Sequence, residues 1–327
     1  REEILKKAKE EEVEVVEEKT VITQLTPTVI KTGAWRKLKF QKYNVKLPTP
    51  HIHPGKRHYL QQVIERIRKV WIEMGFKEMV GPIVEVSFWN FDALFQPQDH
   101  PARDLADTFY MKIPERGKLP SRDIVEAVKA THESGWVTGS IGWQYEWDEE
   151  FSKKCVLRTH TTSLSARTLA MLRKDISKNA LPAKYFAVGR TFRNETLDWK
   201  HLAEFHQTEG IVVGENVNFK HLLGYLKEFF FKLGFEKIRF RPAYFPYTEM
   251  STEVEIFHPV YKEWVELGGS GIFRPEVVKP LLGIDIPVLA WGLAVERLVM
   301  LHYDIKDIRE LYWNDLKQLR EIKLWLR

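Results

Sequence analysis

A polar stretch near the middle of the chain carries side chains whose types and spacing suit the binding of anions. Strand-like alternation places Arg193 and Glu195 on one face of a predicted strand, and Phe205, Gln207 and Glu209 on one face of the strand that returns after a polar loop. A sheet face of this composition is too polar for a core and too aromatic for an ordinary surface. An arginine fork binds phosphate or carboxylate oxygens, and a flat ring offers a stacking surface for a base. If the protein binds a nucleotide, the sequence places it here.

Each of these features also has a simpler explanation when it is taken alone. An Arg-x-Glu pair on a strand is usually a surface ion pair, and a single phenylalanine such as Phe205 is usually core. The sequence GLAVER at 292–297 predicts a helix that Gly292 opens and that carries Arg297. Alone, it is typical of a helix start with a surface charge pair. Only the order of motifs along the chain separates these explanations from a ligand site.

The predicted elements that would position these residues show no βαβ rhythm. Apolar residues recur at helical spacing from Leu60 to Met74, with Gly75 placed to end the helix. The segment FKEMVGPIVE predicts one strand that carries Pro82 at a sheet edge or a bulge. Further strands are predicted at Tyr185–Phe192, Glu204–Val213, Ile238–Phe240, Val254–Phe257 and Glu263–Leu267, and helices at Ser163–Lys174, Phe219–Leu233 and Leu293–His302. This pattern predicts an α+β fold, a mostly antiparallel sheet flanked by helices.

Composition and missing motifs exclude several classes of protein. With 44% hydrophobic and 29% charged residues, the 327-residue chain predicts a soluble protein with a large core. No apolar run approaches the roughly 18 residues of a membrane helix. A single cysteine, Cys155, excludes an internal disulfide or a cysteine-cluster zinc site and favours a cytoplasmic location. The net charge of +5 suits a nucleic-acid partner without demanding one. Neither a GxxxxGK[ST] loop nor a GxGxxG motif is present.

The N-terminal part differs in character from the rest. Residues 1–19 are a charge run typical of a solvated helix or a linker, and a proline-rich segment follows before the long helix. We therefore predict a truncated connector at 1–48 and the main domain at 49–327. Because the first residue is not methionine, we also expect the sequence to be a fragment of a longer chain.

Three histidines in the proline-rich segment raise the possibility of a metal site. His51, His53 and His58 are close in sequence, but no cysteine or carboxylate cluster accompanies them. We therefore interpret this segment as the entrance to the long helix.

Three motifs, taken in order, resemble motifs 1, 2 and 3 of the class II aminoacyl-tRNA synthetases. They are GFKEMVGP at 75–82, FRNE at 192–195 with its loop and returning strand, and GLAVERL at 292–298. Further stretches resemble the catalytic α subunits of the archaeal and eukaryotic phenylalanyl-tRNA synthetases: HPARDLADTFY at 100–110, LRTHTTS at 157–163, HLAEFHQTEG at 201–210, RPAYFPYTE at 241–249 and WVELGGSGIFRPE at 264–276. The resemblance runs from about Thr20 to Tyr312. It implies a class II catalytic domain that activates L-phenylalanine with ATP and transfers it to tRNA(Phe).

The resemblance assigns one group of residues to ATP. The reaction joins two anions, so the site must supply cations that hold the reactants in line. Arg193 would bridge the attacking carboxylate and the α-phosphate, and Arg297 would hold the γ-phosphate. The remaining ATP contacts are implied for Glu195 at the adenine amino group, His201 on the pyrophosphate side, Phe205 as the adenine platform, and Glu266 with Glu255 as candidate ligands of Mg²⁺.

A second group of residues is implied for phenylalanine. His160, Thr162, Gln207 and Glu209 would hold the α-ammonium and the neighbouring carboxylate, since a buried ammonium needs acceptors. The implied walls of the ring pocket are Phe245 and Tyr247, and its implied floor is Ala290.

The resemblance also implies partners. Motif 1 builds an interface between catalytic domains in class II enzymes, and in this family the partner is a β subunit in an (αβ)₂ heterotetramer. A hydrophobic site rejects an added hydroxyl only weakly, so editing of tyrosine is expected in the β subunit. Two alternatives stay open: a synthetase-like protein that has lost the reaction, and a class II synthetase for another amino acid, such as phosphoserine or pyrrolysine.

Overall fold

The computed structural model describes residues 21–48, 55–174, 176, 181–258 and 262–323, which form parts of two compact units at 1–55 and 56–327. The predicted charge run, and His51 and His53, lie outside the described residues. The predicted domain boundary at 48/49 also borders this gap, so it stays a prediction.

The described part of the first unit contains two short parallel strands and two short helices. The strands are β1 (Val21–Ile22) and β2 (Lys39–Phe40), joined through α2 (Pro27–Lys31) and η1 (Ala34–Arg36). Thr26 caps α2, accepting a hydrogen bond from the Val29 N–H, and a proline occupies the first turn, where its missing N–H costs nothing.

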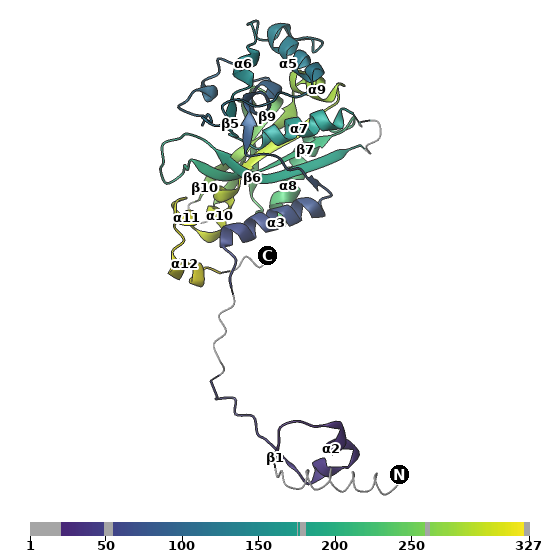
Figure 1. The fold of residues 1–327 in the computed structure, drawn as a ribbon, viewed down its shortest axis with the longest axis vertical. Coiled ribbons are helices and arrows are strands. Elements are labelled where there is room, and N and C mark those ends of the chain that lie inside the picture. Colours follow the sequence, from purple (N-terminus) through teal and green to yellow (C-terminus); the bar gives the residue numbers. More distant parts are fainter. Residues whose placement is uncertain (1–20, 49–54, 175, 177–180, 259–261, 324–327) are drawn as a thin grey trace. The chain divides into compact units, whose positions relative to one another are not determined.

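The second unit is built on a seven-stranded sheet of order β3-β6-β7-β11-β10-β9-β8 (Figure 1). Its strands are β3 (Lys77–Glu78), β6 (Ala183–Phe192), β7 (Glu204–Val213), β8 (Ile238–Phe245), β9 (Thr248–His258), β10 (Glu263–Phe273) and β11 (Val288–Ala294). Every pairing is antiparallel except that of β3 with β6. The structure therefore confirms the predicted α+β fold with a mostly antiparallel sheet.

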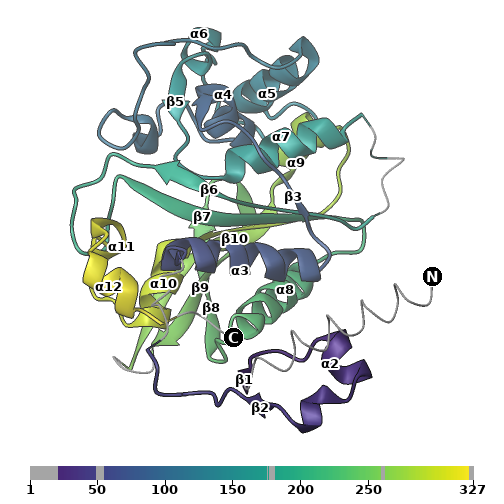
Figure 2. The ribbon, with the colours of Figure 1, turned by 60° about the horizontal axis from the view of Figure 1, so that its bottom comes forward.

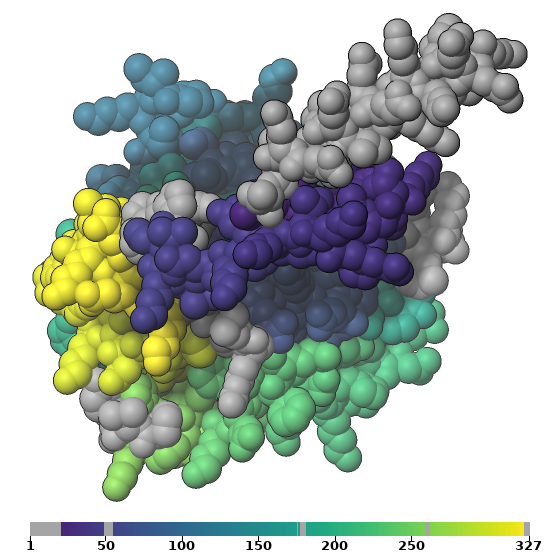
Figure 3. Space-filling view, turned by 90° about the horizontal axis from the view of Figure 1, so that it is seen from below, coloured from purple at the N-terminus to yellow at the C-terminus, as the bar shows by residue number. Residues whose placement is uncertain are grey.

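Helices cover both faces of this sheet (Figures 1 and 2). The face below it in Figure 1 carries α3 (Tyr59–Glu73), α8 (Phe219–Lys232) and α10 (Val295–Tyr303). The opposite face carries α4 (Ser87–Asn90), α5 (Arg122–Ser134), α7 (Thr162–Leu172) and α9 (Pro275–Leu282). Shorter elements are η2 (Asp92–Leu94), η3 (Pro101–Arg103), α6 (Glu149–Ser152), and, at the surface in Figure 3, α11 (Glu310–Trp313) and α12 (Leu316–Glu321). Among the described helices, none is long and apolar enough to cross a membrane.

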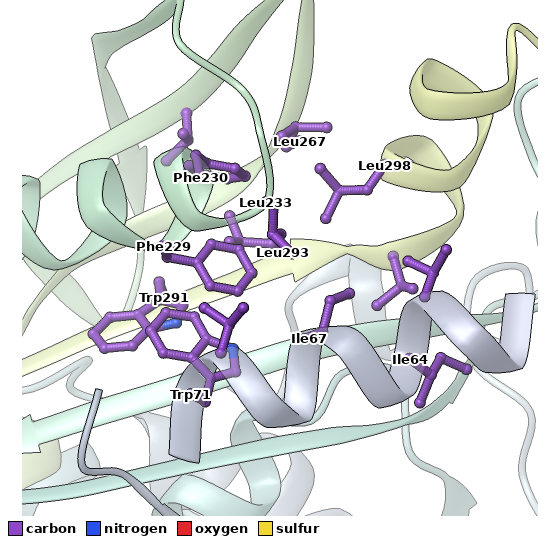
Figure 4. Close-up of a cluster of buried hydrophobic side chains, with 14 of the residues drawn as sticks. Ile64, Ile67, Trp71, Phe229, Phe230, Leu233, Leu267, Trp291, Leu293 and Leu298 are labelled. Atoms are coloured by element: carbon purple, nitrogen blue, oxygen red, sulfur yellow. The ribbon is translucent and has the colours of Figure 1, made fainter. Parts of the chain in front are cut away.

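The long helix α3 forms as the sequence predicts. Its side chain spacing buries one stripe from Leu60 to Trp71, His58 caps its start by accepting from the Leu60 N–H, and Gly75 follows its end with φ +82°. The Trp71 indole stacks on Phe229 of α8 at a centroid distance of 4.1 Å and on Trp291 of β11 at 5.1 Å (Figure 4). This aromatic core fixes α3 and α8 against the sheet face that lies behind the site.

Two predictions about these elements are wrong. The segment 76–85 is not one strand: β3 joins the large sheet, whereas β4 (Val84–Val86) pairs with β5 (Cys155–Leu157) in a separate ladder. The Gly81–Pro82 pair breaks the strand because proline lacks the ladder N–H. Gly292 does not open a helix but lies in β11, and α10 begins only at Val295.

Candidate active site

The β6–β7 ladder places the predicted polar residues side by side. Its register pairs Ala187 with Glu209, Gly189 with Gln207 and Thr191 with Phe205, which confirms that the three predicted β7 residues share one face, while Arg193 and Glu195 follow the last paired residue. Further along β7 the same face carries Ile211, which is buried under the helices. One sheet face therefore serves as core at one end and as a polar site at the other.

Arg193 lies directly after β6, where several elements hold it. Its backbone N–H donates to the Ala203 carbonyl at 3.0 Å, and its Nε donates to the Thr159 carbonyl at 3.2 Å. The guanidinium carbon lies 5.2 Å from the centre of the Phe205 ring, and a terminal nitrogen lies 3.6 Å from the Glu195 carboxylate. Its side chain keeps 44% of its surface exposed, so the fork remains open to a ligand.

Arg297 approaches the same space from the first turn of α10. Its guanidinium donates to the Glu266 carbonyl at 2.9 Å and lies 3.7 Å from the Glu266 carboxylate on β10. The N-terminus of a helix carries unpaired N–H groups and a partial positive charge, which favour an anion nearby. The two arginines thus reach one space from different strands and helices.

Glu209 is a deeply buried carboxylate of the site, with 1% of its surface exposed. Its oxygens accept hydrogen bonds from the hydroxyls of Thr161, Thr162 and Ser165 at 3.1–3.2 Å, and from the Gln207 amide at 3.1 Å. Burial outweighs these donors and raises the pKa of Glu209 to about 8. A buried carboxylate with oriented donors is a suitable acceptor for a ligand cation.

His160 supplies a neutral polar group beside it. Burial lowers the pKa of the ring to about 3, and both ring nitrogens are buried without a hydrogen-bond partner among the described residues. A buried polar atom without a partner costs free energy unless a ligand satisfies it. The ring is therefore available to a bound molecule.

The other end of the site is aromatic. Phe245 and Tyr247 stack at a centroid distance of 6.1 Å, and Phe273 meets Tyr247 edge-on at 6.3 Å. Ala290 on β11 is buried beside them and closes this end with a single methyl group. An apolar end of this kind suits a flat hydrophobic side chain.

One cavity of about 310 Å³ joins these two ends. Every predicted site residue lines it except Glu255, so His160, Thr162, Arg193, Glu195, His201, Phe205, Gln207, Glu209, Phe245, Tyr247, Glu266, Ala290 and Arg297 come together. Glu255 is 5% exposed and forms an ion pair with Arg239, although the β9–β10 register sets it opposite Glu266. Glu253, whose carboxylate pairs with Arg241 at 2.7 Å, lines the cavity instead.

The loop between β6 and β7 closes one side of the cavity. His201 lies in it and contacts the Asp198 carboxylate at 2.9 Å, and this hydrogen bond lowers the pKa of Asp198. Lys200 also lines the cavity and was not predicted.

The sequence interpretation also missed the glycines that make room for these side chains. A Cβ at Gly292 would lie 2.1 Å from the Gln207 amide nitrogen, and a Cβ at Gly269 would lie 2.3 Å from the Phe245 ring. Both glycines are visible in the sequence, but only the packing of the folded chain shows which side chains cross them. The cavity therefore depends on backbone positions where no side chain fits.

We expect Gly269→Ala to disturb the aromatic end selectively. The added methyl must push the Phe245 ring, so we expect the binding of an aromatic ligand to fall about tenfold, a cost of about 1.4 kcal/mol typical of overpacking. The matched control is Gly224→Ala on α8, where a Cβ meets nothing within 4 Å and alanine favours the helix. Equal ligand affinity in the two variants, measured by calorimetry, would contradict this account.

The fold and the cavity together define the catalytic core of a class II aminoacyl-tRNA synthetase: an antiparallel sheet with arginines and an aromatic ring on its open face. The chain matches the family described as tRNA synthetases class II core domain (F) over residues 42–322, and it belongs to that family.

Curated relatives narrow the similarity further. The chain is 56% identical over 315 residues to the phenylalanine–tRNA ligase alpha subunit of Methanothermobacter thermautotrophicus, which covers 96% of this chain and 59% of that relative. It is 54% identical over 306 residues to the subunit of the same name from Methanopyrus kandleri, covering 93% and 57%. The subunit from Methanocaldococcus jannaschii is 50% identical over 310 residues, covering 95% and 62%. The chain thus spans about three fifths of the length of these relatives.

Proposed function

We propose that this chain is the catalytic core of a phenylalanine–tRNA ligase α subunit, which activates L-phenylalanine with ATP and transfers it to tRNA(Phe). The observation that carries the proposal is that a cationic end and an aromatic end belong to one cavity and meet beside Glu209. An amino acid that spans the two ends would present its side chain to the rings and its carboxylate to the arginines. The relatives named above support the same assignment.

Activation joins the amino-acid carboxylate to ATP. A carboxylate oxygen forms a bond to the α-phosphorus, and the bond from that phosphorus to the bridging oxygen breaks, so pyrophosphate leaves. Arg193 would contact both reacting anions, since its fork is open and anchored through Nε. Arg297 would hold the γ-phosphate at the α10 N-terminus. These contacts stabilise the charge that develops during the transfer.

The adenine would lie against Phe205, with Glu195 accepting from its amino group and His201 on the pyrophosphate side. Phe205 is half-buried, lines the cavity and belongs to none of the buried hydrophobic clusters. Its ring is therefore free to stack on a ligand and does not contribute to the hydrophobic core.

Phenylalanine would occupy the opposite end. Glu209 and Gln207 would accept from its ammonium, with His160 and Thr162 beside them. Its ring would pack between Phe245 and Tyr247 above Ala290. Only an ionised Glu209 can neutralise the ammonium, so binding would draw the carboxyl into its charged form.

Mg²⁺ is implied by the reaction, and the residues present fit it. The described residues contain no group of three or more acidic, histidine or cysteine side chains arranged to hold a metal. Mg²⁺ in nucleotide sites, however, needs only one or two carboxylates besides phosphate oxygens and water. Glu266, which lines the cavity, would hold the ion, which would neutralise phosphate charge when bound. Glu255, the other predicted ligand, is paired with Arg239 and does not line the cavity.

The proposal includes a β subunit, an (αβ)₂ heterotetramer, tRNA(Phe) and a cytoplasmic location. The Gly81–Pro82 segment supports a partner surface, because Val80 keeps 85% of its surface exposed and Ile83 keeps 41%. Exposed apolar side chains beside a sheet edge are typical of an interface.

Exchange of pyrophosphate into ATP, measured across the amino acids with the α and β chains together, tests the proposal. We expect exchange with phenylalanine. Exchange with no amino acid would indicate a relative that has lost the reaction. Exchange with another amino acid would indicate a different synthetase, although phosphoserine needs a cationic pocket in place of Phe245 and Tyr247, and pyrrolysine needs more room than Ala290 leaves.

We expect Phe205→Leu to weaken ATP without unfolding the protein. Leucine keeps the apolar volume but lacks the flat face, and stacking of a base on an aromatic ring is worth about 1–3 kcal/mol. The KM for ATP should therefore rise roughly five- to hundredfold, while phenylalanine binding without ATP stays within twofold. A fall in melting temperature with the KM for ATP unchanged would show that Phe205 serves the core and does not stack on adenine.

A further inference from the structure

Asn194 stands between two proposed ATP residues and hydrogen-bonds to a distant part of the chain. Its backbone N–H donates to the Asp107 carbonyl at 3.0 Å, and its side-chain amide donates to the Leu105 carbonyl at 2.9 Å. Both donors of one residue therefore bind the same turn, residues 104–108, which lies about 90 positions earlier in the chain. Asn194 itself is exposed.

This turn is closed by its own hydrogen bonds. The N–H groups of Asp107 and Thr108 donate to the Asp104 carbonyl at 3.0 and 2.9 Å, and the Thr108 hydroxyl donates to the Ala102 carbonyl at 2.7 Å. Thr108 is 1% exposed, whereas Leu105 is 74% exposed. The turn therefore lies at the surface and is held at its end by the buried Thr108.

A buried ion pair anchors the start of the turn. The Arg103 side chain, next to Asp104, lies 3.3 Å from the Asp92 carboxylate, and both side chains are almost completely buried. Asp92 also accepts from the Trp147 indole at 2.8 Å, and the Arg103 guanidinium lies over the Phe91 ring at 4.9 Å. Because separating a buried ion pair is strongly unfavourable, this anchor holds the turn in place.

We propose that Asn194 is a positioning residue that ties the Arg193–Glu195 segment to this anchored turn. The segment follows the last ladder pair of β6, and the cross-strand bond from the Arg193 N–H to Ala203 is the last that holds it to the returning strand. Arg193 has its own anchors, but Glu195 has only the ion pair to Arg193 at 3.6 Å among the contacts of the described residues. Asn194 supplies the fixed point between the two side chains, which then diverge toward the cavity.

This inference rests on the proposed function, because its readout is amino-acid activation. Small errors in the placement of reacting groups reduce the rate strongly, whereas an exposed hydrogen bond contributes little to stability. Loss of the tie should therefore reduce turnover more than stability.

The test is Asn194→Ala in the chain assembled with its β subunit, measured by phenylalanine-dependent pyrophosphate exchange. We expect kcat to fall about tenfold, phenylalanine binding without ATP to stay within twofold, and the melting temperature to hold. The matched control is Asn218→Ala, an exposed asparagine that caps α8 through the N–H groups of Lys220 and His221. It should lose melting temperature, since caps are worth about 1 kcal/mol, and keep kcat.

A second pair of variants acts on the turn without touching Asn194. Thr108→Val removes the hydroxyl that closes the turn and should lower kcat, as Asn194→Ala does. Thr108→Ser keeps the hydroxyl and should leave kcat unchanged. If the wild type shows phenylalanine-dependent pyrophosphate exchange but Asn194→Ala retains full kcat, the inference is overturned while the proposed function stands. If wild type shows no such exchange, the proposed function fails. Amide hydrogen exchange at residues 104–108, which needs no enzymatic activity, would then test whether Asn194 holds this turn. Faster amide hydrogen exchange in Asn194→Ala supports the inference, and an unchanged rate overturns it.

Discussion

Glu209→Gln is expected to abolish most phenylalanine binding while stabilising the free protein near pH 8. Glutamine keeps the shape and can still accept a hydrogen bond, but it cannot neutralise the ammonium. Removing one partner of a buried ion pair costs roughly 3–5 kcal/mol, so the dissociation constant should rise on the order of 10²–10⁴-fold. Titration calorimetry with phenylalanine alone measures this directly.

The same carboxyl sets a pH dependence with a defined sign. Burial raises its pKa from the ordinary 4.5 to about 8, so between these values the unfolded carboxyl ionises while the folded one stays protonated. The free energy of unfolding should therefore fall as pH rises from 4.5 to 8, and this contribution should vanish in Glu209→Gln. Melting temperatures of both proteins across this range measure it.

Phenylalanine binding should follow the opposite trend. Because the ammonium requires the ionised carboxylate, affinity should rise with pH up to about 8, and about one proton should be released per ligand bound at pH 7. Calorimetry in buffers of different ionisation enthalpy counts that proton. The control is Glu204→Gln, a half-buried carboxylate on the same strand that pairs with Arg190 at 3.2 Å and does not line the cavity. Identical pH profiles for the two variants would refute the assignment of Glu209.

Arg193→Lys is expected to reduce activation about a hundredfold or more, with a much smaller change in ATP affinity. Lysine keeps the charge but offers no planar fork, and its single nitrogen has to serve the Thr159 carbonyl and both anions. Interactions that tighten in the transition state affect kcat more than binding. Pyrophosphate exchange for turnover and equilibrium binding of ATP separate the two effects.

A neighbouring arginine provides the control for this result. Arg190 lies on the opposite face of β6 from Thr191, is 56% exposed, and pairs with Glu204 outside the cavity. Arg190→Lys should leave both kcat and ATP affinity unchanged. Near wild-type turnover in Arg193→Lys would show that charge alone suffices at that position.

The strands that carry the site could be predicted because their side chains alternate clearly. The predicted bounds of β7 agree with the structure, and those of β6 differ only by two residues at its start. The strands β8, β9 and β10 extend further than predicted, because Pro242, Gly268 and Gly269 weaken the local signal while the neighbouring strands supply the hydrogen bonds.

The strand β11 was missed for a different reason. Its run VLAWGLA is buried on both faces, with Trp291 toward α3 and Ala290 toward the cavity. A short apolar run of this kind is ambiguous between strand and helix, and its continuation into α10 favoured the wrong choice.

Residue chemistry by itself determined which side chains meet. Arginines, carboxylates and aromatic residues with period-two spacing specify one polar sheet face, since alternation fixes the face of each side chain. The tertiary structure alone decided how that face is supported. In the folded chain, Glu209 is buried beside the first turn of α7, and Glu255 pairs with Arg239. Gly269 and Gly292 leave room for neighbouring side chains, and Asn194 hydrogen-bonds to a turn that is distant in sequence. Burial, clearance and long-range hydrogen bonds depend on which segments pack together, and no local pattern in the chain encodes that.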